Sequence, residues 1–333
     1  MIRIILAFIL VACSLLLGIF TAVGGVAPVD ETAAIKPTEP SAVSPAADDV
    51  LEEDQRDNLA IRWFNSQKPA ALRGVALVIH GLNLHPDRMG PIINHLNGSG
   101  IDVLSLSLRG HGANYEHRDD MDAAAARLET FKTVSYTLWL NEAYLAYLQV
   151  QKRARQRQVP VFLAAFSIGG LIGLDLLISN PDVYFDRIVL LAPAISLRPA
   201  IYLERILSPF PRLVIPSMAD DAYLANKSGT PVAAYNALFD AFDHFEEKAG
   251  AKLNLPTLLF IDERDEFIPL RGLKDLVAEY NLDQWQFYIV QKEEEMTDGT
   301  FHHHILDASS TGERVWRDMM AATVRHLLGD KAK

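Results

Sequence analysis

Short apolar runs alternate with amphipathic stretches from residue 59 onwards. Continuous apolar runs, typical of parallel strands covered on both faces, occur at 75–79, 161–164 and 188–192, and we expect further strands at 102–108, 256–261 and 285–290. Apolar positions at helical spacing occur at 86–96, 131–149, 171–178, 270–280 and 315–327. Residues 59–64 alternate loosely, so we expect an early antiparallel strand there. This alternation of strands and helices predicts an α/β fold, with a mostly parallel sheet and helices on both faces.

The regular alternation breaks between residues 196 and 252. This stretch holds five prolines and an apolar cluster from Ile201 to Ile215, followed by a helical face of Leu238, Phe242 and Phe245. We therefore expect a helical insertion that forms a cap on the sheet domain. Two alternatives stay open for its apolar side chains: they line a groove for a substrate, or they pack as core.

The N-terminal segment has a different composition. Residues 4–27 carry no charge and follow Arg3, and they are numerous enough to span a bilayer. Three interpretations stay open: a cleaved secretory signal ending at 25–27, an uncleaved anchor, or a bacterial lipoprotein signal at Cys13. The apolar run that continues after Cys13 favours the anchor. Each interpretation places the protein outside the cytoplasm, secreted or tethered to a membrane, with the bacterial periplasm or cell envelope as the expected location.

Three segments follow from these patterns: a signal or anchor at 1–27, a linker at 28–56 and a folded domain at 57–330 that contains the cap. Proline, alanine and a final acidic run predict that the linker is flexible. The 333 residues are 50% hydrophobic and 22% charged, which suits a large buried core. A formal net charge of -11 argues against a nucleic-acid partner, and the single cysteine excludes an intramolecular disulfide.

Candidate chemistry begins at Ser167, which follows the apolar run 161–164. The sequence Ala165-Phe166-Ser167-Ile168-Gly169 has the layout of a nucleophile elbow, a tight turn between a strand and a helix. The turn needs small residues two positions before and after the serine, and Ala165 and Gly169 supply them. Alanine replaces the usual glycine at the first of these positions.

A serine hydroxyl needs a histidine to take its proton and a carboxylate to orient that histidine. Asp265 lies just after the expected strand 256–261, and the histidines at 302, 303 and 304 follow the expected strand 285–290. The order serine, aspartate, histidine along the chain is that of the α/β-hydrolases.

Several landmarks together resemble the lid-bearing branch of the α/β-hydrolases that includes monoacylglycerol lipases, lysophospholipases and serine aminopeptidase-like proteins. They run in order over about residues 55–330: His80-Gly81, Leu108-Arg109-Gly110-His111-Gly112, Ser167 with Gly169-Gly170, and Asp265 with Ile268-Pro269. The resemblance implies an α/β-hydrolase fold with a helical cap. It also implies that Ser167 is the nucleophile, that Asp265 is the orienting acid, and that the N–H groups of Leu82 and Ile168 form the oxyanion hole.

The resemblance ranks the remaining candidates. Asp262 stands where relatives often have glycine, so it is the second choice for the acid. His303 fits the family pattern of a histidine, one variable residue, two aliphatic residues and a polar residue. His304 is the second choice and His302 the third. We expect His80 and His111 to be structural.

The chemistry implied is hydrolysis of an acyl ester, such as a lipid, through an acyl-enzyme, by an esterase, lipase or lysophospholipase near a membrane. A peptidase or an acyltransferase remains open within the enzyme class, and a non-catalytic binding or sensor protein outside it. Neighbouring histidines do not converge on one point, so we expect no metal, and no cofactor motif is present.

Overall fold

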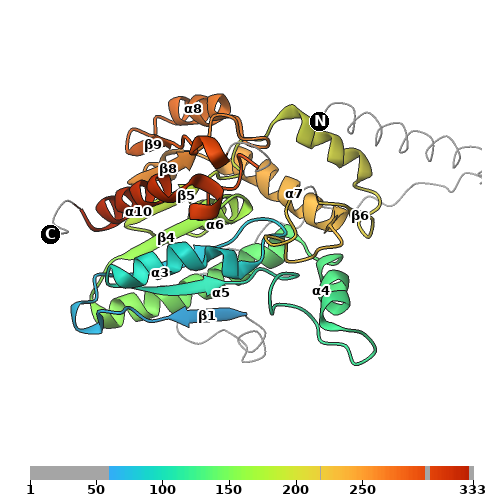
Figure 1. The fold of residues 1–333 in the computed structure, drawn as a ribbon, viewed down its shortest axis with the longest axis horizontal. Helices are drawn as coiled ribbons and strands as arrows, with labels where there is room; N and C mark the ends of the chain where they lie inside the picture. Colours follow the sequence, from blue (N-terminus) through green and yellow to red (C-terminus); the bar gives the residue numbers. More distant parts are fainter. Residues whose placement is uncertain (1–59, 218, 297–300, 330–333) are drawn as a thin grey trace, which may run out of the picture. The chain divides into compact units, whose positions relative to one another are not determined.

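A computed structural model describes residues 60–217, 219–296 and 301–329. Its main feature is a seven-stranded sheet with the order β1-β3-β2-β4-β5-β8-β9 (Figure 1). The strands are β1 (Ile61–Phe64), β2 (Gly74–Ile79), β3 (Ile101–Leu106), β4 (Val161–Phe166), β5 (Arg187–Leu191), β8 (Thr257–Ile261) and β9 (Trp285–Ile289). Only β1 is antiparallel to its neighbour, and all other pairs in this sheet are parallel. The expected α/β fold and its early antiparallel strand are therefore confirmed.

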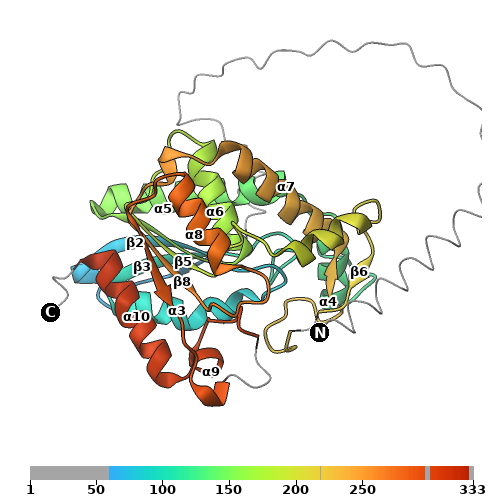
Figure 2. The same cartoon turned by 90° about the horizontal axis from the view of Figure 1, so that it is seen from above.

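Helices pack on both faces of this sheet. On one face, α3 (Gly90–Gly98) contacts β3, and α10 (Glu313–Leu328) contacts β5, β8 and α3. On the other face, α5 (Tyr136–Arg157), α6 (Ile168–Ser179) and α7 (Val232–Lys248) contact one another (Figure 2). Every residue of β2, β3 and β4 is buried, as expected for parallel strands covered on both sides.

The remaining elements are short or connect the strands. They are η1 (Pro69–Ala71), η2 (Pro86–Met89), α4 (Ala123–Phe131), η3 (Pro199–Leu207), β6 (Val214–Ile215), β7 (Thr230–Pro231), η4 (Ala251–Leu253), α8 (Leu270–Glu279), η5 (Glu294–Met296) and α9 (Ala308–Thr311).

The expected helix at 131–149 is wrong in its bounds. The structure has two helices here, because α4 ends at Phe131 and α5 begins at Tyr136. Ser135 explains the new start: its side chain accepts a hydrogen bond from the Leu138 N–H and caps α5. Phe131 and Val134 are buried in the core, so the apolar spacing correctly predicted burial although it spans a helix boundary.

The segment between β5 and β8 has two parts with different surroundings. Helix α7 buries Leu238, Phe242 and Phe245 against the core, and it contacts α5 and α6 beside the sheet. In contrast, η3 has no fully buried residue. Large apolar side chains of η3 and the loop after it are exposed, by 43% at Leu203, 61% at Ile206, 48% at Phe210 and 47% at Leu213.

The expected anchor at 1–27 and linker at 28–56 lie outside the described residues. Within the part of the chain that the structure describes, no helix combines the length and the apolar character needed to cross a membrane.

Candidate active site

Ser167 occupies a strained turn between β4 and α6. Its φ of 53° and ψ of -120° lie in a region that non-glycine residues rarely adopt. The turn brings the start of α6 against the end of β2: a Cβ atom on Gly169 would lie 2.5 Å from the carbonyl oxygens of Ile79 and His80. Ala165, two residues before the serine, is completely buried. The backbone at Ser167 therefore has the geometry expected of a nucleophile elbow.

A chain of hydrogen bonds connects three of the predicted residues. The Nε2 atom of His303 lies 2.9 Å from the Ser167 Oγ atom, and the His303 Nδ1 atom lies 2.8 Å from Asp265 Oδ2. Asp265 follows β8 and His303 follows β9, so the carboxyl ends of three parallel strands supply the three side chains. The other Asp265 oxygen accepts hydrogen bonds from the N–H groups of Phe267 and Ile268, each at 2.8 Å, which fixes the carboxylate.

This arrangement determines the tautomer of a neutral His303. An ionised carboxylate can only accept hydrogen bonds, so the Nδ1 atom beside Asp265 carries the hydrogen. The Nε2 atom is then free to accept the Ser167 hydroxyl proton. Both side chains are buried, with exposed fractions of 7% for His303 and 0% for Asp265. Exclusion of water strengthens the interaction between the two groups.

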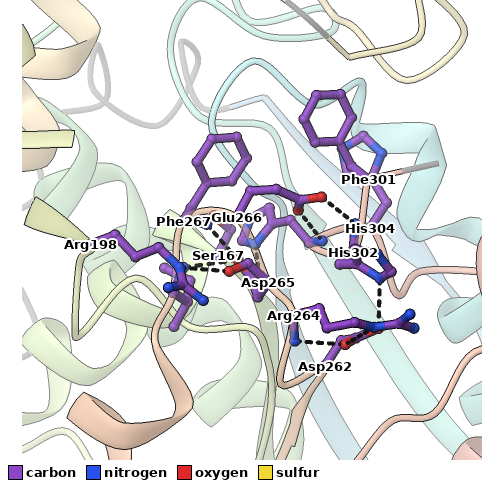
Figure 3. Close-up of polar contacts among 12 residues, drawn as sticks. Ser167, Arg198, Asp262, Arg264, Asp265, Glu266, Phe267, Phe301, His302 and His304 are labelled. Carbon is purple, nitrogen blue, oxygen red and sulfur yellow. Dashed lines mark hydrogen bonds and ion pairs between the residues drawn. The ribbon is translucent and has the colours of Figure 1, made fainter. Parts of the chain in front are cut away.

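The alternative residues lie nearby in other roles. His302 directs its Nδ1 atom to Asp262 Oδ2 at 3.0 Å, so the second-choice acid pairs with the third-choice histidine (Figure 3). His304 stacks on Tyr223, with ring centroids 4.6 Å apart. Burial lowers the pKa of His304 to about 3, with smaller contributions from His303 and Lys292, so its ring is neutral at ordinary pH. Of the three histidines, only His303 makes a hydrogen bond to Ser167.

The oxyanion hole expected from the N–H groups of Leu82 and Ile168 stays a prediction. No described residue accepts a hydrogen bond from the N–H of Leu82 or from that of Ile168, so both donors remain available. Gly81 is packed tightly, because a Cβ atom there would lie 3.3 Å from the Cβ of Ser167. Asn83 adopts a φ of 50°, and its N–H donates to the His111 ring at 2.9 Å.

His80 and His111 accept hydrogen bonds from the backbone near the loop after β2, in agreement with the structural role expected for them. The His80 Nε2 atom accepts a hydrogen bond from the Leu108 N–H at 3.0 Å, and the two rings lie 4.6 Å apart. Burial lowers the pKa of His80 to about 4 and holds that of His111 well below its usual value. Both rings are therefore neutral, and each presents an unprotonated nitrogen to a backbone N–H.

Two supporting residues were not found by sequence reasoning: Asn226, which acts here through its main chain, and Glu142, which acts through its side chain. Asn226 belongs to the insertion, yet it exchanges hydrogen bonds with Asn83: the Asn226 N–H donates to Asn83 Oδ1, and Asn83 Nδ2 donates to the Asn226 carbonyl. Glu142 of α5 accepts hydrogen bonds from the Arg109 N–H and from Asn114. Burial raises the pKa of Glu142 to about 7. Neither residue lies near a recognisable motif, so the sequence carried no signal for them.

A surface hollow of about 440 Å³ lies next to the loop that carries Asp265, but Ser167 does not line it. Its walls are mostly charged, with Arg198, Glu263, Arg271, Lys274 and Asp275 beside Pro269 and Leu270. The expectation that the apolar residues of the insertion line a groove stays a prediction. Among the described residues, no group of three or more histidine, cysteine, aspartate or glutamate side chains could hold a metal ion.

Comparison with known families gives one match. The model of the family described as serine aminopeptidase, S33, matches residues 70–226, a range that includes Leu82, His111 and Ser167. No curated protein matches the sequence.

Solved structures with the same fold include several lipolytic enzymes. A soluble variant of monoglyceride lipase from Saccharomyces cerevisiae, solved with a substrate analogue, is 14% identical with a TM-score of 0.64, over 82% of this chain and 91% of that one. One structure from the pair of metagenome-derived lipolytic enzymes LipS and LipT is 17% identical with a TM-score of 0.60, over 80% of this chain and 96% of that one. Monoacylglycerol lipase from Paleococcus ferrophilus is 19% identical with a TM-score of 0.55, over 80% of this chain and 99% of that one. At these identities the likeness establishes the fold, and it agrees with the landmarks found in the sequence.

Proposed function

Because the chain has the α/β-hydrolase fold and resembles its lipase- and serine aminopeptidase-like branch, we propose that it is a serine hydrolase that cleaves carboxylic esters. The observation that carries this proposal is the continuous line of hydrogen bonds from Asp265 through His303 to Ser167. A serine alone is a weak nucleophile, and a base that is itself held by a carboxylate is what activates it.

In the proposed reaction, Ser167 Oγ attacks the ester carbonyl while His303 Nε2 takes the hydroxyl proton. Asp265 stabilises the imidazolium that forms and remains ionised. The Leu82 and Ile168 N–H groups donate to the oxyanion of the tetrahedral intermediate. His303 then gives its proton to the departing alcohol, which leaves an acyl group on Ser167. A water molecule then attacks this acyl group while His303 Nε2 takes one of its protons. The bond between Ser167 Oγ and the acyl carbon breaks, His303 returns the proton to Ser167 Oγ, and the acyl group leaves as the carboxylic acid.

We further propose a lipid-like acyl ester as the substrate. Support comes from the exposed apolar side chains of η3 and the following loop, which are more numerous than a solvated surface segment needs. Structural neighbours that are monoglyceride lipases agree with this class. The uncharged run at residues 4–27 supports a further proposal, that the protein is tethered to a membrane outside the cytoplasm.

One experiment tests the central proposal. The full-length protein is treated with a fluorophosphonate probe, which labels activated serines, and the modified residue is identified by mass spectrometry. We expect the label on Ser167, together with hydrolysis of p-nitrophenyl esters. A protein that takes up no label and hydrolyses no ester in the series from acetyl to decanoyl would instead indicate the non-catalytic binding function.

The same ester series tests the substrate class, and cell fractionation tests the location. Each buried methylene contributes up to about 0.8 kcal/mol, so kcat/KM should rise several-fold per two carbons until the acyl site is full. A flat or falling series contradicts the lipid-like substrate. Recovery of the protein in the cytosol contradicts the tether.

A peptidase is the second candidate, because the matching family model is described as a serine aminopeptidase. The catalytic groups proposed here would serve amide and ester cleavage alike. Aminoacyl p-nitroanilides compared with p-nitrophenyl esters of similar size distinguish the two activities. We expect the esters to be the better substrates.

A further inference from the structure

Two charged side chains from different elements hold the backbone that carries His303. Glu266 lies in the loop after β8, and Lys292 lies just after β9. Glu266 accepts hydrogen bonds from N–H groups of the segment 301–304, and Lys292 donates hydrogen bonds to its carbonyl groups. The backbone of the segment 301–304 is therefore held both through N–H groups and through carbonyl groups.

The Glu266 contact fixes two consecutive peptide groups. Its Oε1 atom accepts from the His302 N–H at 3.0 Å (Figure 3). Its Oε2 atom accepts from the His303 N–H at 3.0 Å. Hydrogen bonds to an ionised carboxylate are stronger than those between neutral groups, and a two-point contact also fixes orientation. Glu266 directly follows Asp265, which contacts the His303 ring. One short loop thus holds both the ring and the main chain of His303.

Lys292 holds the opposite side of the segment. Its amino group donates to the Phe301 carbonyl at 2.6 Å and to the His304 carbonyl at 2.7 Å. The side chain is buried, with 6% of its surface exposed. Burial lowers the pKa of Lys292 to about 8, although the carboxylates of Asp262, Glu266 and Asp265 oppose that shift. A buried amino group is costly to keep, so it needs the compensation that these carbonyls and carboxylates supply.

We propose that Glu266 and Lys292 are positioning residues that keep the His303 ring aligned between Asp265 and Ser167. Neither side chain contacts Ser167 in the structure, so both would act through the main chain of the segment 301–304. The inference rests on the proposed function, in which His303 is the general base. A displacement of the base by about 1 Å is enough to slow a reaction by about 100-fold, so the alignment of this segment affects turnover.

The first test compares Glu266→Gln with Glu263→Gln. Glutamine has the shape of glutamate, but its amide nitrogen cannot accept a hydrogen bond, so one of the two N–H contacts is lost. Glu263 lies in the same loop and is exposed, which makes it the matched control. We expect Glu266→Gln to lower kcat for p-nitrophenyl butyrate by about 10- to 100-fold with KM within about twofold. Glu263→Gln should keep the parent values.

A second pair tests the carbonyl side. Lys292→Met removes both donors and keeps most of the aliphatic volume, whereas Lys274→Met removes an exposed lysine of α8. We expect Lys292→Met to lower kcat with little change in KM, as for Glu266→Gln, and Lys274→Met to keep the parent values. Thermal unfolding of each variant, measured at the assay pH, gives the folded fraction, and kcat is expressed per folded molecule.

Proton NMR gives a readout that does not depend on turnover. The hydrogen between His303 Nδ1 and Asp265 Oδ2 should give a resonance far downfield of the amide region, and its position reports the geometry of that bond. We expect it to shift or broaden in Glu266→Gln and Lys292→Met and to stay unchanged in the two controls. A parent protein that hydrolyses no ester would refute the proposed function, while the resonance would still decide the positioning role.

Two results would overturn the inference. One is an unchanged kcat and an unchanged resonance in both Glu266→Gln and Lys292→Met. The other is a fall in activity that follows the folded fraction alone, including a variant that does not fold, because this would make the two residues general stabilisers of the domain.

Discussion

The Nε2 atom of His303 lies 2.9 Å from the Ser167 Oγ atom, although 136 residues separate the two in the sequence. Ser167 stands at the end of β4 and His303 follows β9, the edge strand three places away in the sheet. Their proximity arises because both lie at the carboxyl ends of parallel strands, the edge at which open α/β sheets bind ligands. The first three predictions below follow from this contact.

Replacement of the nucleophile should abolish hydrolysis. Ser167→Ala removes the attacking oxygen, and loss of such a group typically costs about 10⁴-fold or more in turnover. Hydrolysis of p-nitrophenyl esters measures the loss, and the thermal unfolding curve should stay close to that of the parent. Activity retained by this variant would remove Ser167 from the mechanism.

Replacement of each histidine in turn should separate their roles. His303→Ala should be as inactive as Ser167→Ala, because the nucleophile loses its base. His302→Ala and His304→Ala should keep measurable activity, since His302 pairs with Asp262 and His304 stacks on Tyr223. The rates are compared at a pH where the parent is fully active. An inactive His304→Ala with an active His303→Ala would transfer the role of base to His304.

The two aspartates should differ in the same way. Asp265→Asn puts an amide beside His303 Nδ1 and favours the wrong tautomer, so kcat should fall by about 10³- to 10⁴-fold. Asp262→Asn is the control, because Asp262 contacts His302 and Arg264 and makes no hydrogen bond to His303. We expect it to keep kcat within about tenfold. Equal losses in both variants would argue that the loop as a whole, and not the Asp265 carboxylate, sustains activity.

The elbow should not tolerate a larger residue at Gly169. The added methyl group of Gly169→Ala would lie 2.5 Å from the main-chain oxygens of Ile79 and His80 at the end of β2, so the helix or the strand must move, at a cost of about 1–3 kcal/mol in the free energy of unfolding. Gly90→Ala is the control, because a Cβ atom at this helical glycine meets no atom within 4 Å. Urea unfolding of both variants measures the difference. Equal stabilities would show that the elbow has more room than the structure indicates.

The buried lysine should make stability depend on pH. The pKa of Lys292 is about 8 in the folded protein, against 10.5 for an ordinary lysine, so between these values the unfolded chain binds more protons. Lys292 therefore contributes a rise in stability with increasing pH across this window, of at most about 1.4 kcal/mol per pH unit. Lys292→Met should lack this contribution in urea unfolding from pH 7.5 to 10. The same slope in parent and variant would contradict the lowered pKa.

The sequence by itself determined most of the secondary structure and the layout of the turn at Ser167. These features depend on local patterns: buried parallel strands need continuous apolar runs, and a tight strand-to-helix turn needs small residues at fixed positions. The helix boundary at Ser135 was missed because apolar spacing continues across it, whereas the cap depends on one hydrogen bond from Leu138.

Only the tertiary structure decided which histidine faces Ser167 and what holds it there. His302, His303 and His304 are adjacent and chemically identical, so only the resemblance to a family pattern ranked His303 first, and no local physical property distinguishes their rings. Their directions depend on partners far away in the sequence, such as Asp265 and Glu266 after β8. The same reason hides the contact between Asn83 and Asn226, which are 143 residues apart. Periodicity reports which face of an element is buried, but the pairing of polar groups follows from how distant loops meet.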